Sequence, residues 1–297
     1  MGMNPTPLPD HLPASGFTAR AALDAGVSAK RLRGRDLVTP SRGLRVAADA
    51  SFGQRCIATM LVLPETARVA GVSAARIMGV PLPLHLEQED VIHVVVPRRV
   101  RAPQRSGVAA RSMTMDPTET RLWLGIRISN PARTWCELAP VLDVPDLVAA
   151  ADYLVAWRMP LTTVSELLAA TATVRRGAPK LRLAVPLVNS RSESRRESLL
   201  RVILIRAGVT GIEVNLPIRT SGGFSYRADL AFPARKLIIE YQSRFHEGAA
   251  FYKDMTRRSR LEADGWFVME INAMDLHNPH ELVQRVRTVL SARSVVR

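Results

Sequence analysis

The sequence predicts a mixed α/β (or α+β) protein with an N-terminal winged helix-turn-helix, a mixed middle region and a C-terminal mixed sheet flanked by helices. Two observations predict this class. Residues 16–50 hold two short helical segments followed by two short apolar runs around a glycine turn. Residues 226–242 hold two runs in which side chains alternate with period two, and helical patterns flank them. With 297 residues and 47% hydrophobic content, the chain is long enough for two domains.

The charge of the chain favours a polyanionic partner such as DNA. Lys and Arg number 41 against 27 Asp and Glu, which gives a net charge of +14 and a pI near 11.0. A biased base composition of the coding DNA is a competing cause, because most of the basic residues are arginine. The charge therefore supports DNA binding without deciding it.

Cysteine usage and hydropathy predict a soluble cytoplasmic protein with no membrane partner. Cys56 and Cys136 lie in apolar contexts, which suits buried thiols in a reducing compartment. No apolar run reaches the roughly 18–20 residues that a transmembrane helix needs. The N-terminal residues lack the charged and apolar regions of a signal peptide.

The N-terminal part predicts a winged-helix module after a disordered, proline-rich stretch at residues 1–15. In residues 16–50, a helix from Thr18 is closed by Gly26, Ser28 caps a second helix, and the runs 37–40 and 44–47 form a two-stranded wing. Basic residues around this module are candidate phosphate contacts: Lys30, Arg31, Arg33, Arg35, Arg42 and Arg45. A winged helix can also serve only as a protein-contact module, so that alternative stays open.

The middle region, residues 51–171, mixes helices with one strongly apolar strand. Helical patterns cover residues 54–63, 72–78, 132–138 and 147–157, and residues 91–96 form the β run. The arginines of residues 98–105 are typical of a solvated loop, and His85 and His93 are isolated enough to be structural. No catalytic constellation is evident here. Residues 172–189 combine charge with glycine and proline, which predicts a connector to the second domain at 190–297.

Residues 226–242 predict a β-hairpin with one core face and one polar face. Side chains alternate along both strands. The predicted core face comprises Ala228, Leu230, Phe232, Leu237, Ile239 and Tyr241. The predicted polar face comprises Arg227, Asp229, Lys236, Ile238, Glu240 and Gln242. A turn at Pro233 and Ala234 sets Leu230 opposite Ile239, so the apolar faces coincide.

The same register sets Asp229 opposite Glu240. Carboxylates paired across a ladder lie roughly 5 Å apart at Cβ and repel each other. A divalent cation such as Mg²⁺ would offset the repulsion, because it binds through one or two carboxylates together with water and phosphate oxygens. The alternative is an exposed strand face that happens to carry two acids, and the hairpin alone does not distinguish the two.

Further segments occur around the hairpin in a specific order. They are Glu197-Ser198-Leu199-Leu200-Arg201, Arg227-Ala228-Asp229-Leu230, Glu240-Tyr241-Gln242, His246, Asp254 with Arg257, and Gly265-Trp266. Together they resemble the PD-(D/E)XK nuclease core and, more narrowly, the endonuclease-like domain related to very-short-patch-repair (Vsr) enzymes. The resemblance covers residues 191–297. It implies a restriction-endonuclease-like fold and a Mg²⁺- or Mn²⁺-dependent DNA endonuclease of DNA repair or phage defence.

The resemblance also implies roles for the acids. Asp229, Glu240 and the backbone carbonyl of Tyr241 would hold the metal, and Glu197 would complete its coordination. Glu193, one helical turn earlier, is the fallback for Glu197. Since Glu197 and Arg201 share a helix face, a surface ion pair between them is the simpler alternative.

Other predicted site residues depart from the family pattern or have a structural alternative. Gln242 stands where the nuclease motif usually has lysine, and glutamine can orient water without deprotonating it. His246 would act as a general acid or base or position water, although a lone histidine before a helix is more often structural. The helix of residues 247–264 carries the predicted DNA contacts Lys253, Arg257 and Arg258, with Asp254 as a supporting residue.

Three short N-terminal segments carry a second resemblance. They are Ala25-Gly26-Val27-Ser28, Leu37-Val38-Thr39-Pro40 and Arg42-Gly43-Leu44-Arg45-Val46. They resemble the winged-helix start of the abortive-infection type IV antitoxin family, and the likeness extends loosely through the middle region. This resemblance implies an alternative function as a catalytically weak or inactive DNA-binding transcriptional regulator, with a possible toxin or protein partner.

Overall fold

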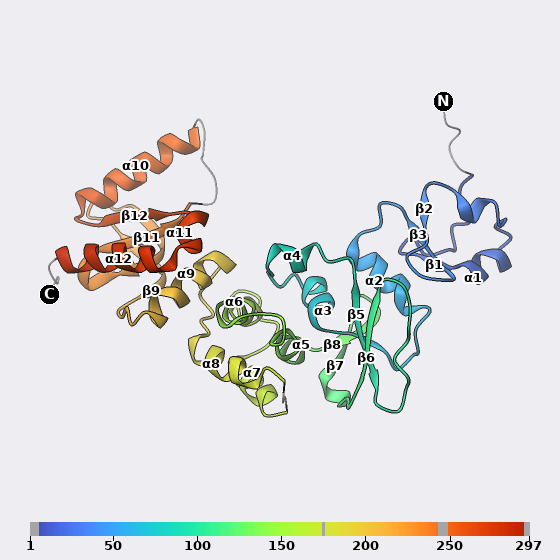
Figure 1. Cartoon of the computed structure of the whole chain (residues 1–297). Coiled ribbons are helices and arrows are strands. Elements are labelled where there is room, and N and C mark those ends of the chain that lie inside the picture. The colour runs from blue at the N-terminus through green and yellow to red at the C-terminus, as the bar shows by residue number, and fades with distance from the viewer. Residues whose placement is uncertain (1–5, 174–175, 243–248, 294–297) are drawn as a thin grey trace. The chain divides into compact units, whose positions relative to one another are not determined.

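The computed structural model describes residues 6–173, 176–242 and 249–293 (Figure 1). It confirms the mixed α/β class, with three open sheets in this part of the chain. Contacts divide the chain into one unit of Met1–Val141 with Ala169–Gly177 and a second of Leu142–Leu168 with Ala178–Arg297. Among the described residues, no helix combines the length and the apolar character needed to cross a membrane.

The N-terminal segment forms a small sheet that includes the predicted wing. Strands β1 (Phe17–Thr18), β3 (Leu44–Ala47) and β2 (Leu37–Val38) pair in that order, and helix α1 (Ala19–Asp24) follows β1. Leu37 pairs with Ala47 and Val38 with Val46, so the two runs predicted as strands of a wing do form an antiparallel pair. Phe17, Ala22, Val27 and Leu32 form the buried core of this segment.

The prediction of a second helix in the helix-turn-helix was wrong in its length. Only one 3₁₀ turn, Arg31–Arg33, forms after Ser28, and Gly34 ends it with an extended backbone. Two contacts hold the turn in place. Leu32 at its centre is buried, and Arg31 at its start bonds to Asp36, which follows the turn. One 3₁₀ turn is too short to act as a recognition helix along a DNA groove.

The middle region forms a five-stranded sheet in the order β6-β5-β4-β8-β7. Its strands are β4 (Arg68–Val69), β5 (Ile92–Pro97), β6 (Val108–Met113), β7 (Thr120–Trp123) and β8 (Ile126–Ser129). Its helices are α2 (Phe52–Met60), α3 (Gly71–Ile77), α4 (Leu84–Glu87) and α5 (Pro131–Leu138). Strand β5 and helices α2, α3 and α5 confirm predicted elements, whereas the other four strands had no predicted counterpart.

The next helices differ from the predicted grouping of residues 51–171. Helix α6 (Val144–Leu154) packs against α8 (Ala178–Ala184) and α9 (Arg195–Arg206) of the second unit. A buried ion pair joins Asp152 of α6 to Arg201 of α9 at 2.7 Å. Helix α7 (Val164–Thr171) lies between α6 and α8 in the chain. The predicted connector, residues 172–189, therefore contains helix α8, which packs against α6.

The second unit contains the predicted mixed sheet flanked by helices. Its strands β9 (Glu213–Arg219), β10 (Ser225–Phe232), β11 (Leu237–Tyr241) and β12 (Phe267–Ile271) lie in the order β12-β11-β10-β9. Strands β9, β10 and β11 are antiparallel neighbours, and β11 and β12 are parallel. Strand β9 had not been predicted.

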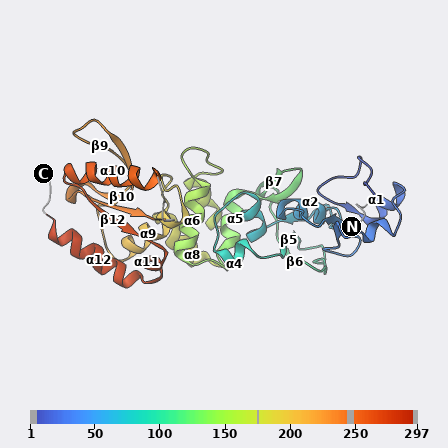
Figure 2. The ribbon, with the colours of Figure 1, turned by 90° about the horizontal axis from the view of Figure 1, so that it is seen from above.

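Helices cover both faces of this sheet (Figures 1 and 2). On one face, α9 and α12 (Pro279–Ala292) supply Leu200 and Leu282 to a core with Leu230 and Ile239. On the other face, α10 (Ala249–Ala263) supplies Leu261, which packs with the cluster of Ile238 and Val268. The short helix α11 (Ala273–His277) precedes α12.

The hairpin has the predicted register but a different division of its faces. Leu230 pairs with Ile239, as predicted. Ile238, expected on the polar face, is fully buried, because a sheet covered by helices on both sides has two apolar faces. Ala228 packs in the cluster of Ile238, whereas Leu230 packs in the opposite cluster, so the alternation shifts by one residue at Asp229.

Candidate functional site

Asp229 lies at the point where the regular alternation of β10 breaks. The β9–β10 ladder pairs Ala228 with Leu216 and Leu230 with Val214 but skips Asp229, opposite which Asn215 has a positive φ of 49°. The carboxylate of Asp229 is therefore turned toward β11, where its Oδ2 accepts the Tyr241 backbone N–H at 3.1 Å.

The electrostatics of Asp229 reflect a neighbouring acid. Burial raises the pKa of Asp229, and the negative charge of Glu240 raises it as well. The bond from Tyr241 and the charge of Arg257 lower the pKa in part, and the upward causes prevail. A half-buried acid with a raised pKa beside a second acid is a frequent feature of functional sites.

Glu240 is held by an arginine of helix α10. The Arg257 guanidinium donates from Nη1 to Glu240 Oε2 at 2.7 Å and from Nη2 to Oε1, so both carboxylate oxygens are engaged. The Arg257 side chain is 25% exposed and that of Glu240 10%. Burial lowers the pKa of Arg257, but the bond to Glu240 and the surrounding acids give a net rise. The guanidinium thus offsets the repulsion between Glu240 and Asp229.

Glu197 connects helix α9 to strand β9. Its Oε2 accepts the Glu193 backbone N–H at 3.0 Å and the Asn215 side-chain amide at 3.0 Å. Burial raises the pKa of Glu197 and the charge of Asp229 raises it further, against the lowering bond from Glu193. The alternative of a surface pair between Glu197 and Arg201 is wrong, because both side chains are buried and Arg201 bonds to Asp152.

The remaining predicted site residues have different placements. Gln242 Nε2 donates to Asp254 Oδ2 at 3.5 Å, and the Gln242 backbone N–H donates to the Ile271 carbonyl at 2.8 Å. Gln242 therefore lies beside an acid of α10. His246 lies outside the described residues.

The oxygen atoms of this site suit a hard cation, but the carboxylate of Glu240 is already bonded to an arginine. Two carboxylates and the carbonyl of Tyr241 are oxygen ligands of the kind that Mg²⁺ prefers. Within the described ranges, however, no group of three or more His, Cys, Asp or Glu is placed to hold a metal ion. Because Arg257 engages both oxygens of Glu240, a cation would have to replace the guanidinium to reach that carboxylate.

The predicted DNA contacts fall into two classes. Arg31 bonds to both oxygens of Asp36, at 2.9 and 2.6 Å, which lowers the pKa of Asp36. Arg257 is held by Glu240, and Arg258 pairs with Glu262 at 2.9 Å. In the described part of the chain, the exposed predicted contacts without an ion-pair partner are Lys30, Arg33, Arg35, Arg42 and Lys253. These five are the ones available to phosphate.

Sequence reasoning missed one basic residue at the site. The guanidinium of Arg196 lies 5.0 Å from the ring centroid of Tyr241, so a cation of α9 stands next to the β11 end that carries Glu240. Arg196 is exposed. The sequence signal that could have identified Arg196 is the Arg195-Arg196 pair immediately before Glu197, but the prediction used only the spacing of the acids.

Replacing Asp229 by asparagine should raise the melting temperature at pH 7.5 by roughly 2–4 °C. The raised pKa means that the charged carboxylate is unfavourable in the folded state. Wild-type stability therefore falls as the pH rises from the unfolded pKa, about 3.8, through the higher folded pKa. The amide keeps an acceptor for Tyr241 and avoids this loss. Differential scanning calorimetry from pH 4 to 8 should show a gain that shrinks toward pH 4; a lower melting temperature at pH 7.5 would contradict it.

Comparison with known proteins shows relatives but no family. No family model matches the chain. Two Mycobacterium tuberculosis proteins, Uncharacterized protein MT2308 (strain CDC 1551 / Oshkosh) and Uncharacterized protein Rv2248 (strain ATCC 25618 / H37Rv), are 34% identical over 161 residues, 52% of this chain. The match spans 59% of each relative's length. The crystal structure of the RV2827C protein from Mycobacterium tuberculosis aligns with a TM-score of 0.40 and 16% identity, over 66% of this chain and 76% of that one.

Proposed function

We propose that the second unit is a Mg²⁺- or Mn²⁺-dependent DNA endonuclease that hydrolyses phosphodiester bonds in DNA repair or phage defence. The observation that supports this proposal is the pair of carboxylates on adjacent strands, Asp229 with a raised pKa and Glu240 beside it. The resemblance of residues 191–297 to Vsr-like enzymes is the reason for proposing phosphodiester hydrolysis as the reaction of this pair. We further propose a cytoplasmic location, since Cys56 and Cys136 are both free thiols.

In this proposal the chain's own residues have separate tasks. Asp229, Glu240 and the Tyr241 carbonyl would hold the cation, with Glu197 behind Asp229. The bound cation would polarise the scissile phosphate and lower the pKa of the attacking water. Gln242 would orient that water through its amide. His246 is proposed, on the resemblance alone, as the residue that assists proton transfer.

DNA would be held by unpaired cations on both units. Arg196 lies against Tyr241 next to Glu240, Lys253 is exposed on α10, and Arg33, Arg35 and Arg42 lie around the N-terminal wing. Arg257 has two tasks in the proposal. It neutralises Glu240 in the free protein and contacts a phosphate once the cation has taken its place. A guanidinium suits both, because it binds carboxylate and phosphate in the same bidentate geometry.

Supercoiled plasmid tests this function. In Mg²⁺ or Mn²⁺ the wild type should nick or linearise the plasmid, and Asp229→Asn should reduce the rate about 100-fold or more, because one of the two proposed metal carboxylates is lost. Glu213→Gln is the matched control, since Glu213 is an exposed acid of β9 to which the proposal gives no role. Equal rates for wild type and Asp229→Asn would assign the nicking to a contaminant.

A second candidate is a non-catalytic DNA-binding regulator of the antitoxin type, with the nuclease-like domain as scaffold and a toxin or other protein as possible partner. The bidentate bond of Arg257 to Glu240 favours it, because an arginine then takes the position proposed for the cation. Gln242 in place of the motif lysine favours it as well. An intact plasmid with either metal, together with DNA binding that Arg33→Ala or Arg42→Ala weakens, would support the regulator.

A further inference from the structure

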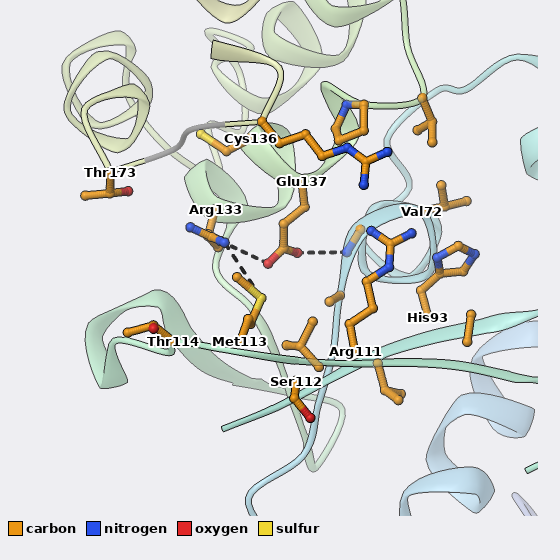
Figure 3. Close-up of a pocket in the computed structure, with 18 residues that line it drawn as sticks. Val72, His93, Arg111, Ser112, Met113, Thr114, Arg133, Cys136, Glu137 and Thr173 are labelled. Atoms are coloured by element: carbon orange, nitrogen blue, oxygen red, sulfur yellow. Dashed lines mark hydrogen bonds and ion pairs between the residues drawn. The ribbon is translucent and has the colours of Figure 1, made fainter. Parts of the chain in front are cut away.

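The middle region contains a pocket of about 400 Å³, formed entirely by residues of the first unit (Figure 3). Its walls come from strands β5 and β6, the start of α3, helix α5, and the residues Thr173 and Arg176. The apolar part of the lining includes Val72, Val94, Met113, Pro140 and Val141. This volume falls in the range of small-molecule sites, roughly 300–1,000 Å³.

Both carboxylate oxygens of Glu137, which lines the pocket, accept hydrogen bonds from the protein itself. Glu137 Oε2 accepts the Gly71 backbone N–H at 2.8 Å and the Ser129 hydroxyl at 2.9 Å. Its Oε1 accepts Arg133 Nε at 3.0 Å and Arg68 at 3.4 Å. Glu137 therefore has no oxygen left for a ligand, and two guanidiniums neutralise its charge.

Two arginines of the pocket remain without a partner. Arg111 of β6 and Arg176 line the pocket and are exposed, and their side chains have no ion pair or hydrogen bond within the described residues. Figure 3 shows the Arg111 side chain rising from its strand into the space between Glu137 and His93. The ring of His93 is held by Glu89 at 3.2 Å. The unpaired charged groups that a ligand would meet are thus these two cations, which lie beside an apolar wall.

We infer that this pocket binds a small organic anion, a phosphate or carboxylate attached to an apolar body. The free guanidinium of Arg111 suits a bidentate contact to either acid group. The apolar wall of β5, α3 and α5 takes the rest of the ligand. Cationic ligands are excluded by the charge, because the only acid in the lining, Glu137, is already bonded on both oxygens.

Three fragments of one size test the inference on the full chain: phenyl phosphate, benzoate and the uncharged benzamide. Saturation-transfer NMR should show at least one anion binding about tenfold more tightly than benzamide. Phenyl phosphate alone would identify a phosphate ligand, and benzoate alone a carboxylate ligand. Arg111→Ala should weaken the anion about tenfold. Arg101→Ala, which removes an exposed arginine outside the lining, should change it less than twofold.

Three results would overturn the inference. They are equal binding of benzamide and the anions, unchanged anion binding in a folded Arg111→Ala variant, and no binding of either anion at millimolar concentration. Because Arg111 has no bonded partner, circular dichroism of that variant should match the wild type. The outcome is independent of plasmid nicking, since the pocket lies in the first unit and the proposed nuclease site in the second.

Discussion

Replacing Asp152 by alanine should lower the free energy of unfolding of the second unit by about 3–5 kcal/mol. Asp152 is 1% exposed and accepts bonds from the Ser198 hydroxyl at 2.6 Å, from Arg201 at 2.7 Å and from the Asn189 backbone N–H at 2.7 Å. Its removal leaves the Arg201 guanidinium, 3% exposed, as an uncompensated charge between α6 and α9. Urea unfolding followed by circular dichroism measures the change.

The double variant Asp152→Leu/Arg201→Met is the control for this prediction. Removing both charges and filling the space with apolar side chains should recover most of the lost stability, because a buried ion pair is often matched by a packed apolar pair. A loss below 1 kcal/mol for Asp152→Ala would show that water enters between the two helices and solvates Arg201. Burial raises the pKa of Asp152 despite Arg201, which is consistent with a site that excludes water.

The elements that sequence reasoning predicted are those with strong local patterns. Strand β5 is apolar except for His93, α5 begins at Pro131 after the Asn130 cap, and Gly208 follows closely after the end of α9 at Arg206. Strand β4 was missed because it is two residues long and carries the fully buried Arg68. No local signal shows that Arg68 is buried, since its partners Glu119 and Glu137 lie 51 and 69 residues away.

In the candidate site, too, the local pattern was predicted and the contacts between distant residues were not. Register alone placed Asp229 next to Glu240, because the pairing of Leu230 with Ile239 fixes both neighbours. The bond of Arg257 to Glu240 could not be read from spacing, because it depends on how α10 packs over the sheet. The sequence pattern paired Arg257 only with Asp254 on its own helix, and that pair is the longer one at 3.6 Å.

Replacing Arg257 by glutamine should destabilise the metal-free protein and make it respond to Mn²⁺. Glu240, 10% exposed, then lies beside Asp229 without a cation, so we expect a loss of roughly 2–4 kcal/mol at pH 7.5. The repulsion relaxes when Asp229, whose pKa is raised, is protonated, so the loss should shrink toward pH 4. Thermal unfolding in chelator at both pH values measures this first half of the prediction.

Mn²⁺ supplies the second half, because a ligand that binds only the folded state stabilises it in proportion to its affinity. At Mn²⁺ one hundred times its dissociation constant the gain is about 2.7 kcal/mol, enough to offset most of the expected loss. The wild type should gain less, because the cation must first displace Arg257 from Glu240. Adding Asp229→Asn to Arg257→Gln should abolish the response, since one of the two proposed metal carboxylates is gone. If Arg257→Gln melts at the same temperature with Mn²⁺ and with chelator, the acids do not bind a cation, and the regulator becomes the better account of this domain.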